Sequence, residues 1–434
     1  MPALILILAA WDYGGVEAPV FWIIGGLSVA AVTLALAWGR RLDESTPRAR
    51  LWDWRWGGPL LALLGYMAVQ ALNASHACSP ADAGLTPRPH LRWLPSSVDA
   101  RTTGLAMIRL AAYGAVFWLV GATVADRRGR RVFLYLLVAA GFAMAVLALA
   151  QRMGPKNFAI YPLTGRFVGE NNYAAYANLL FPVALALGRR EQVRARERGA
   201  GSHPGYLLYL AAGTLVASVI ASTSITGIAV CLGTLLLWVA IECRRAHASL
   251  RGMLAAVALL GATAAVALTA LGPRALSANA AVGQLPTWRA QAESRAGVYG
   301  ATLRMFRDRW GFGIGAGTFA LGFPYYQPRD VGGFYRYAHQ DYLQYLAELG
   351  LAGSALLAAT AAGVVGRIRP AAVWNSTTRR GVAVALFGVA GHALMDFPLH
   401  IPAIALLAVA WLALLTLPAQ GAGGRSKHPA GGGC

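Results

Sequence analysis

Apolar stretches of about 16 to 22 residues recur along almost the whole of this chain, and they limit its fold more than any other feature. A helix rises about 1.5 Å per residue, so such stretches match a hydrocarbon core of about 30 Å. Only 13% of the residues are charged, against about 25% in ordinary soluble proteins. The sequence therefore predicts an all-α polytopic membrane protein, and it excludes the soluble enzyme classes.

Twelve stretches are expected to form transmembrane helices, separated by short polar loops and one long one. They lie at 1–12, 18–38, 58–75, 103–124, 132–150, 173–188, 206–221, 226–242, 253–271, 350–366, 382–397 and 403–418.

The net charge of +20 is distributed as expected for loops that orient helices in a membrane. One alternate set of loops holds 23 of the 38 Lys and Arg residues and the opposite set holds 14. The positive-inside rule then places both termini in the cytoplasm. Because the basic residues lie between apolar stretches and form no continuous face, we expect no nucleic-acid partner.

This topology divides the chain into four parts. Residues 1–271 form about nine transmembrane helices, 272–349 form a long periplasmic loop, 350–418 form the C-terminal helices, and 419–434 form a disordered cytoplasmic tail. Long loops in compact proteins are usually functional, so the site is expected in the periplasmic loop.

The periplasmic segments are rich in arginine and contain no DxD or ExxE pair. A hard divalent cation usually needs such a carboxylate cluster, so we expect neither a metal nor another cofactor. A guanidinium binds phosphate through two hydrogen bonds and keeps its charge, which suits a diphosphate ligand. Arg166, directly before a span, and Arg295, in the long loop, are the best candidates.

His339 is the best candidate for proton transfer. On a helix it would share one face with Leu343, Leu346 and Gly350, at the water end of an apolar stripe. Imidazole accepts a proton from a hydroxyl near neutral pH. Asp341 would point elsewhere on such a helix, so no local dyad is expected.

Two further segments permit more than one interpretation. His392 and Asp396 are polar groups near a predicted helix end, where a functional role and a packing role are equally favoured. Residues 311–317 read GFGIGAG, which is interpreted as a tight turn because no strand and helix of a phosphate loop surround it.

The block at 339–350, HQDYLQYLAELG, resembles the hallmark of the O-antigen ligase and O-antigen polymerase superfamily, membrane glycosyltransferases of the bacterial envelope. Three more stretches are similar to that family in order and spacing: GRFVGENNY at 165–173, FRDRWGFGIGAGTF at 306–319 and MDFPLHIP at 395–402. Family members often carry an arginine where this chain reads SITG at 224–227. Ile225 cannot bind phosphate, so Arg289 and Arg336 are the candidate substitutes.

The resemblance implies a GT-C-like fold of about twelve transmembrane helices. It implies an enzyme of the bacterial inner membrane that moves a glycan from undecaprenyl diphosphate to an acceptor hydroxyl on the periplasmic side of the lipid bilayer, without a metal. Arg166 and Arg295 would hold the diphosphate, and His339 would orient or deprotonate the acceptor. The other residues expected to contact substrate are Arg289, Arg336, Asn171, Asn172, Tyr299 and Tyr342.

Ligases and polymerases of this superfamily share these motifs. A ligase, which transfers the finished glycan to lipid A core, is slightly favoured over a polymerase that joins lipid-linked O-antigen or exopolysaccharide repeats. A transporter would need repeat-related halves and ionisable residues near the bilayer midplane, where Arg109 is the single charge we expect. A structural scaffold would leave the arginine-rich loop unexplained.

Overall fold

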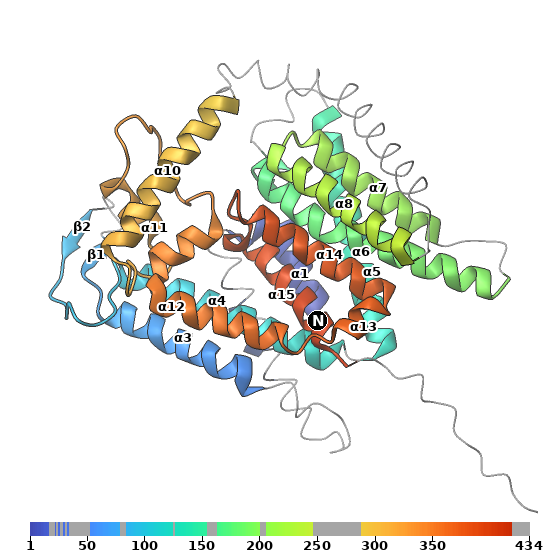
Figure 1. Cartoon of the computed structure of the whole chain (residues 1–434), viewed down its shortest axis with the longest axis horizontal. Helices are drawn as coiled ribbons and strands as arrows, with labels where there is room; N and C mark the ends of the chain where they lie inside the picture. The colour runs from blue at the N-terminus through green and yellow to red at the C-terminus, as the bar shows by residue number, and fades with distance from the viewer. Residues whose placement is uncertain are drawn as a thin grey trace, which may run out of the picture.

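The computed structural model describes residues 1–16, 53–78, 84–124, 126–153, 163–199, 205–245 and 288–418, together with isolated positions between 22 and 33. These parts are mainly helical (Figure 1). The longer helices are α3 (Trp54–Leu72), α4 (Ala100–Thr123), α5 (Arg127–Met153), α6 (Glu170–Glu197), α7 (Gly205–Ala221), α8 (Ile225–Arg245), α10 (Trp288–Asp308), α12 (Asp341–Val365), α14 (Thr377–His392) and α15 (Pro402–Thr416).

Shorter elements connect these helices. They are α1 (Pro2–Trp11), η1 (Tyr13–Gly15), α11 (Phe319–Gly322), η4 (Phe323–Tyr325), α13 (Pro370–Trp374) and η5 (Pro398–His400). Two antiparallel hairpins complete the fold: β1 (His76–Cys78) with β2 (Leu85–Pro87), and β3 (Leu163–Thr164) with β4 (Phe167–Val168).

Helices occupy most of each predicted apolar stretch that the structure describes. Within the described ranges, α4, α5, α8 and α12 are long and apolar enough to cross a membrane, and α1, α7 and α15 are apolar but shorter. Stretch 253–271 and most of 18–38 lie outside the described residues, so the total of twelve spans stays a prediction. The predicted span 382–397 is wrong at its end: α14 stops at His392, and Pro398 disfavours helical backbone at the residue before it.

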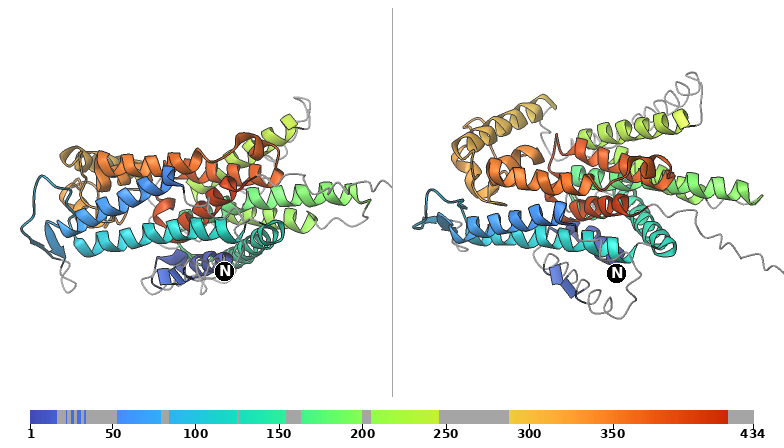
Figure 2. Two further views of the ribbon diagram at one scale, coloured as in Figure 1. Left: turned by 90° about the horizontal axis from the view of Figure 1, so that it is seen from below. Right: turned by 60° about the horizontal axis from the view of Figure 1, so that its bottom comes forward.

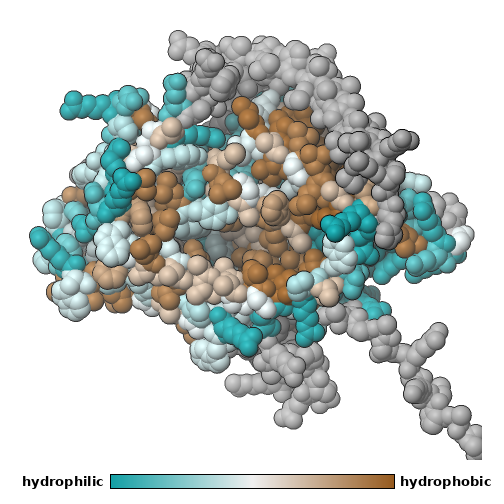
Figure 3. Space-filling view, viewed as in Figure 1, coloured by the Kyte–Doolittle hydropathy of each residue, from teal (hydrophilic) through white to brown (hydrophobic). Residues whose placement is uncertain are grey.

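Hydrophobic side chains cover the middle of the face seen in Figure 3, and hydrophilic side chains gather toward its two ends. At one end lie α10, α11 and the β1–β2 hairpin, and α3, α4 and α12 run side by side toward them (Figures 1 and 2). An apolar middle between polar ends is the arrangement expected of a protein that crosses a bilayer.

The arginine-rich loops that were predicted to share one side of the membrane do meet at one end of the bundle. Glu191 of α6 accepts hydrogen bonds from Arg190 and Arg194, at 2.9 and 3.1 Å, and lies 3.6 Å from Arg131 of α5. Glu242 of α8 binds Arg380 of α14 at 2.7 Å. The carboxylates thus offset part of the repulsion among clustered guanidinium groups.

The glycine-rich segment at 311–317 is a turn, as predicted, and it packs against a break in α12. Gly350 has a φ of 63° and a ψ of −172°, so the helix ladder is interrupted there. Backbone groups on both sides of the break pair with this segment instead: the carbonyl oxygen of Ala347 accepts a hydrogen bond from the N–H of Ile314 at 3.0 Å, and the N–H of Leu351 donates to the carbonyl oxygen of Trp310 at 2.8 Å. The backbone polar groups that the break frees are thereby satisfied.

Glycines allow α6, α8 and α14 to approach closely. A Cβ atom on Gly381 of α14 would lie 2.6 Å from the carbonyl oxygen of Pro182 in α6, and one on Gly227 of α8 would lie 2.3 Å from Ala174 of α6. Small residues at such crossings are typical of helix association in membranes.

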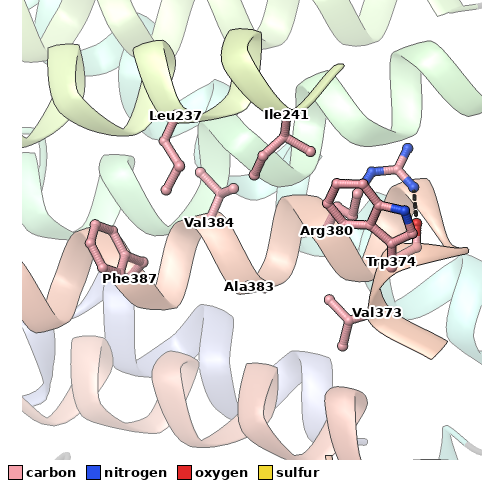
Figure 4. A pocket seen from close by; sticks show the side chains of 8 residues that line it. All are labelled: Leu237, Ile241, Val373, Trp374, Arg380, Ala383, Val384 and Phe387. Carbon is pink, nitrogen blue, oxygen red and sulfur yellow. Dashed lines mark hydrogen bonds between the residues drawn. The ribbon is translucent and has the colours of Figure 1, made fainter. Parts of the chain in front are cut away.

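A small apolar cleft opens between α8, α13 and α14, near the end where the arginines cluster (Figure 4). Leu237, Ile241 and Phe387 line it, and Arg380 and Trp374 lie at one end. Arg380 is near the first residue of α14 and His392 is its last. Twelve helical residues correspond to about 18 Å, so the end of the cleft that holds Arg380 and Trp374 is remote from His392 and the polar groups beyond it.

We predict that Gly381→Ala lowers the apparent melting temperature of the purified protein, because the added methyl group meets backbone and has nowhere to move. Overpacking of this kind costs about 1–3 kcal/mol. Gly391→Ala, in the same helix, is the matched control, because nothing lies within 4 Å of its Cβ position. Thermal unfolding in detergent should show a lower midpoint for Gly381→Ala only; equal midpoints for the two variants would contradict this packing.

Candidate functional site

Polar residues gather where α10, the start of α12 and the link between α14 and α15 meet. This link, residues 393–401, is not α-helical; it contains a turn at 393–395 and the short 3-10 helix η5. Its backbone is held by the start of α12: the N–H of Asp341 donates to the carbonyl oxygens of Ala393, at 3.0 Å, and Asp396, at 3.2 Å.

His339 lies just before α12, so the prediction that it belongs to a helix face with Leu343 and Leu346 is wrong. Gln340 is the N-cap, and its side chain accepts a hydrogen bond from the N–H of Leu343, which starts the helix two residues after the histidine. His339 has a φ of 55°, which is uncommon for a residue with a side chain. Such strained backbone is often found at functional sites.

The side chain of His339 is joined to Asp396, 57 residues away in sequence. Its Nδ1 atom lies 3.1 Å from Oδ1 of Asp396, which also accepts a hydrogen bond from the N–H of Phe397 at 3.0 Å. The carboxylate is almost fully buried, at 1% exposure, whereas His339 is 29% exposed. The sequence interpretation left open whether Asp396 is functional or structural; the structure places it on the imidazole.

Arg295 of α10 approaches the same carboxylate. Its Nη2 atom lies 4.0 Å from Oδ2 of Asp396, and its Nη1 atom donates to the carbonyl oxygen of Met395 at 3.3 Å. Burial favours the protonated form of Asp396, but the hydrogen bond and charge of His339, with the charges of His392 and Arg295, outweigh it and lower the pKa of the carboxyl group. The site thus contains a carboxylate held between an imidazole and a guanidinium.

Tyr299, one turn further along α10, fixes the backbone of His339. Its hydroxyl group donates to the carbonyl oxygen of His339 at 2.8 Å. Burial raises the pKa of Tyr299, although the nearby charge of Arg295 acts in the opposite direction. The phenol therefore stays a hydrogen-bond donor at neutral pH.

This geometry can carry out acid–base chemistry on a hydroxyl group. A carboxylate that accepts the Nδ1 proton leaves the lone pair on Nε2 of the imidazole and fixes the ring orientation. Arg295 keeps a positive charge beside the imidazole, where an anionic leaving group would be stabilised.

Three of the sequence-predicted residues form a second group, at the β3–β4 hairpin and the start of α6. Arg166 donates from Nε to the carbonyl oxygen of Trp11 at 3.0 Å, and its guanidinium lies 4.7 Å from the ring centre of Tyr13. Asn171 accepts a hydrogen bond from the hydroxyl of Ser224 at 2.5 Å, and the side chain of Asn172 donates to the carbonyl oxygen of Val168 at 2.8 Å.

The two groups lie at the same end of the bundle. The helix α6, which begins at this hairpin, contacts η5, and η1 contacts both β4 and α15. Arg152, at the end of α5, joins the second group: it donates to the carbonyl oxygen of Ser222 at 3.0 Å, in the turn between α7 and α8. The sequence interpretation did not select Arg152, because the α5 and α7–α8 segments are far apart in sequence.

The remaining predicted residues have less central positions. Tyr342 donates to the carbonyl oxygen of Ala390 in α14 at 2.9 Å, and Arg336 lies over the ring of Tyr337 at 5.9 Å. Arg289 belongs to α10, but its side chain lies outside the described residues. Among the side chains that the structure describes, no group of three or more His, Cys, Asp and Glu is arranged to hold a metal ion.

Comparison with known proteins identifies one family. Residues 210–358 match the family model described as O-antigen ligase, and this stretch includes His339, Arg295 and Tyr299. The resemblance noted from the sequence is thereby confirmed. No curated protein matches the chain at a significant level.

We predict that Tyr299→Phe lowers the stability of the protein by about 1 kcal/mol, the net value of one hydrogen bond. The lost bond is the one to the backbone of His339. Tyr325→Phe is the control, because Tyr325 is 75% exposed. Denaturant or thermal unfolding of both variants should show a loss for Tyr299→Phe alone. An unchanged midpoint for Tyr299→Phe would mean that this bond contributes nothing to the fold.

Proposed function

Because residues 210–358 match the family model described as O-antigen ligase, we propose that this protein is a membrane glycosyltransferase that uses a lipid-linked donor. It transfers a glycan from undecaprenyl diphosphate to an acceptor hydroxyl on the periplasmic side of the inner membrane. The observation that carries the proposal is the joining of His339 to Asp396, with Arg295 beside them.

In this proposal His339 is the general base. Nε2 of the imidazole removes the proton from the acceptor hydroxyl, while the acceptor oxygen forms a bond to the anomeric carbon of the donor sugar. The bond from that carbon to the diphosphate oxygen breaks, and the diphosphate leaves with the electron pair. Asp396 is a positioning residue, because it holds the ring by Nδ1 and stabilises the imidazolium that forms.

Arg295 and Arg166 are proposed to bind the diphosphate. A leaving diphosphate gains negative charge, and cations that are already in place lower the barrier to its departure. Arg295 lies beside His339. Arg166 is fixed by the hydrogen bond from its Nε atom to Trp11 and by the ring of Tyr13, and its Nη atoms take no part in the hydrogen bond to Trp11. With this charge supplied by arginine, we propose that the reaction needs no metal ion.

The acceptor we favour is lipid A core, which would make the enzyme an O-antigen ligase. The alternative is a polymerase, in which the acceptor is a second lipid-linked repeat unit. Both use the same chemistry at His339, and they differ in whether the product can be an acceptor again.

We predict that His339→Ala reduces the rate of glycan transfer by roughly 10²- to 10⁴-fold, the usual contribution of a general base. The assay uses purified protein in nanodiscs with an undecaprenyl-diphosphate-linked glycan, candidate acceptors and a chelator. A single added glycan on lipid A core identifies a ligase, and a ladder of lengths identifies a polymerase. Undiminished product from His339→Ala would refute the assigned role.

We predict that Arg295→Ala reduces transfer by about 10²- to 10³-fold, because it removes a cation from the leaving group. Arg307→Ala is the matched control, since Arg307 is on the same helix and exposed. Steady-state rates at saturating donor compare the two. If both variants lost activity equally, the effect would come from the general charge of α10 and not from a diphosphate site at Arg295.

A further inference from the structure

A second Asp–His pair joins the same two segments as the first pair, with the imidazole and the carboxylate exchanged between the segments. His339 directly precedes α12 and Asp341 is its first residue, whereas Asp396 and His400 come from the link before α15. His339 pairs with Asp396, and His400 pairs with Asp341 through a hydrogen bond between Nδ1 and Oδ1. Each segment thus gives one imidazole and one carboxylate, and the two segments are joined twice.

The second pair is buried. Asp341 has no exposed surface in its side chain and His400 is 9% exposed. The ring of His400 stacks on Tyr345, with 4.6 Å between ring centres and 22° between planes. Its Nε2 atom is buried without a hydrogen-bond partner in the described part of the chain. This imidazole is therefore closed off from an acceptor hydroxyl and is unsuited to act as a base.

Asp341 holds the link on both sides of Asp396. Its Oδ2 atom accepts a hydrogen bond from the N–H of Leu399 at 2.8 Å, and its own N–H donates to the carbonyl oxygens of Ala393 and Asp396. Between these points Phe397 stacks on Tyr337, with 4.4 Å between ring centres. Local hydrogen bonds order residues 393–396 and 398–401 into turns. The contacts with Asp341 and Tyr337 attach these turns to the start of α12, and so decide which residue faces His339.

We infer that Asp341 and His400 are positioning residues that fix the link so that the carboxylate of Asp396 meets Nδ1 of His339. This inference rests on the proposed function, since it concerns the base of that reaction. Removing one member of a buried pair leaves an unpaired polar group, and the link would shift to relieve it. Asp396 would then leave His339, although neither Asp341 nor His400 touches substrate.

The first test needs no glycan. His339 in the purified full-length protein is carbethoxylated with diethyl pyrocarbonate, and its rate of modification is followed on the tryptic peptide 337–367, in which it is the single histidine. His400→Phe keeps a ring for stacking and removes Nδ1. We expect His400→Phe to change this rate by the same factor as Asp396→Asn, and the double variant to match Asp396→Asn alone.

Two results would overturn the inference. One is a wild-type modification rate in His400→Phe; the other is a double variant in which the two changes multiply, since independent effects would then be at work. If His400→Phe does not fold, Asp341→Asn replaces it, because the amide keeps the shape of the carboxylate and loses its charge.

The second test uses the transfer assay. We expect His400→Phe to lower kcat with little change in KM, and to have no further effect in the Asp396→Asn background. A lower melting temperature with wild-type kcat per folded molecule would show a purely structural pair and would overturn the inference. If wild-type protein transferred no glycan, the proposed function would fail, while the modification rates would still report on the link.

Discussion

Irregular backbone in a membrane protein has to find its hydrogen bonds inside the protein, and the link at 393–401 finds them partly in its own turns and partly on the start of α12. The N–H of Asp341 binds carbonyl oxygens of this link, and the carboxylate of Asp341 binds the N–H of Leu399. The rest of the site depends on this attachment, because it carries Asp396 to His339. If α14 continued as a regular helix through residue 397, the helical repeat would set the direction of the Asp396 side chain, and the contacts with α12 would not.

The proposed site combines an imidazole, a buried carboxylate and a guanidinium drawn from three separate elements. Tyr299 and Arg295 come from α10, His339 precedes α12, and Asp396 follows α14. The strained backbone of His339, the hydrogen bond to its carbonyl oxygen and the buried carboxylate all act on one imidazole. Such convergence is what proton transfer requires, since a loosely held ring loses much of its effect.

Much of the helical framework could be predicted from the sequence, because crossing a membrane requires long apolar runs. The meeting of Arg131, Arg190 and Arg380 at one end also followed from the charge distribution. Arg295 and His339 were predicted from their surroundings. The pairing of His339 with Asp396 could not be predicted, since 57 residues separate them and several other carboxylates were equally possible partners for the imidazole. The prediction of a helix through His339 was wrong because the side chain of Gln340 caps α12, so that the helix begins after the histidine. The periodicity of apolar residues does not reveal such a local contact.

The central claim is that His339 and Asp396 act as one unit in transferring the acceptor proton. The most direct measurement is a double-mutant cycle of His339→Ala and Asp396→Asn on the rate of glycan transfer. If Asp396 acts through the imidazole, the double variant should be no slower than His339→Ala alone, because groups that work as a unit are strongly non-additive. A double variant slower by the product of the two single effects would contradict the account, since Asp396 would then serve the reaction independently of His339.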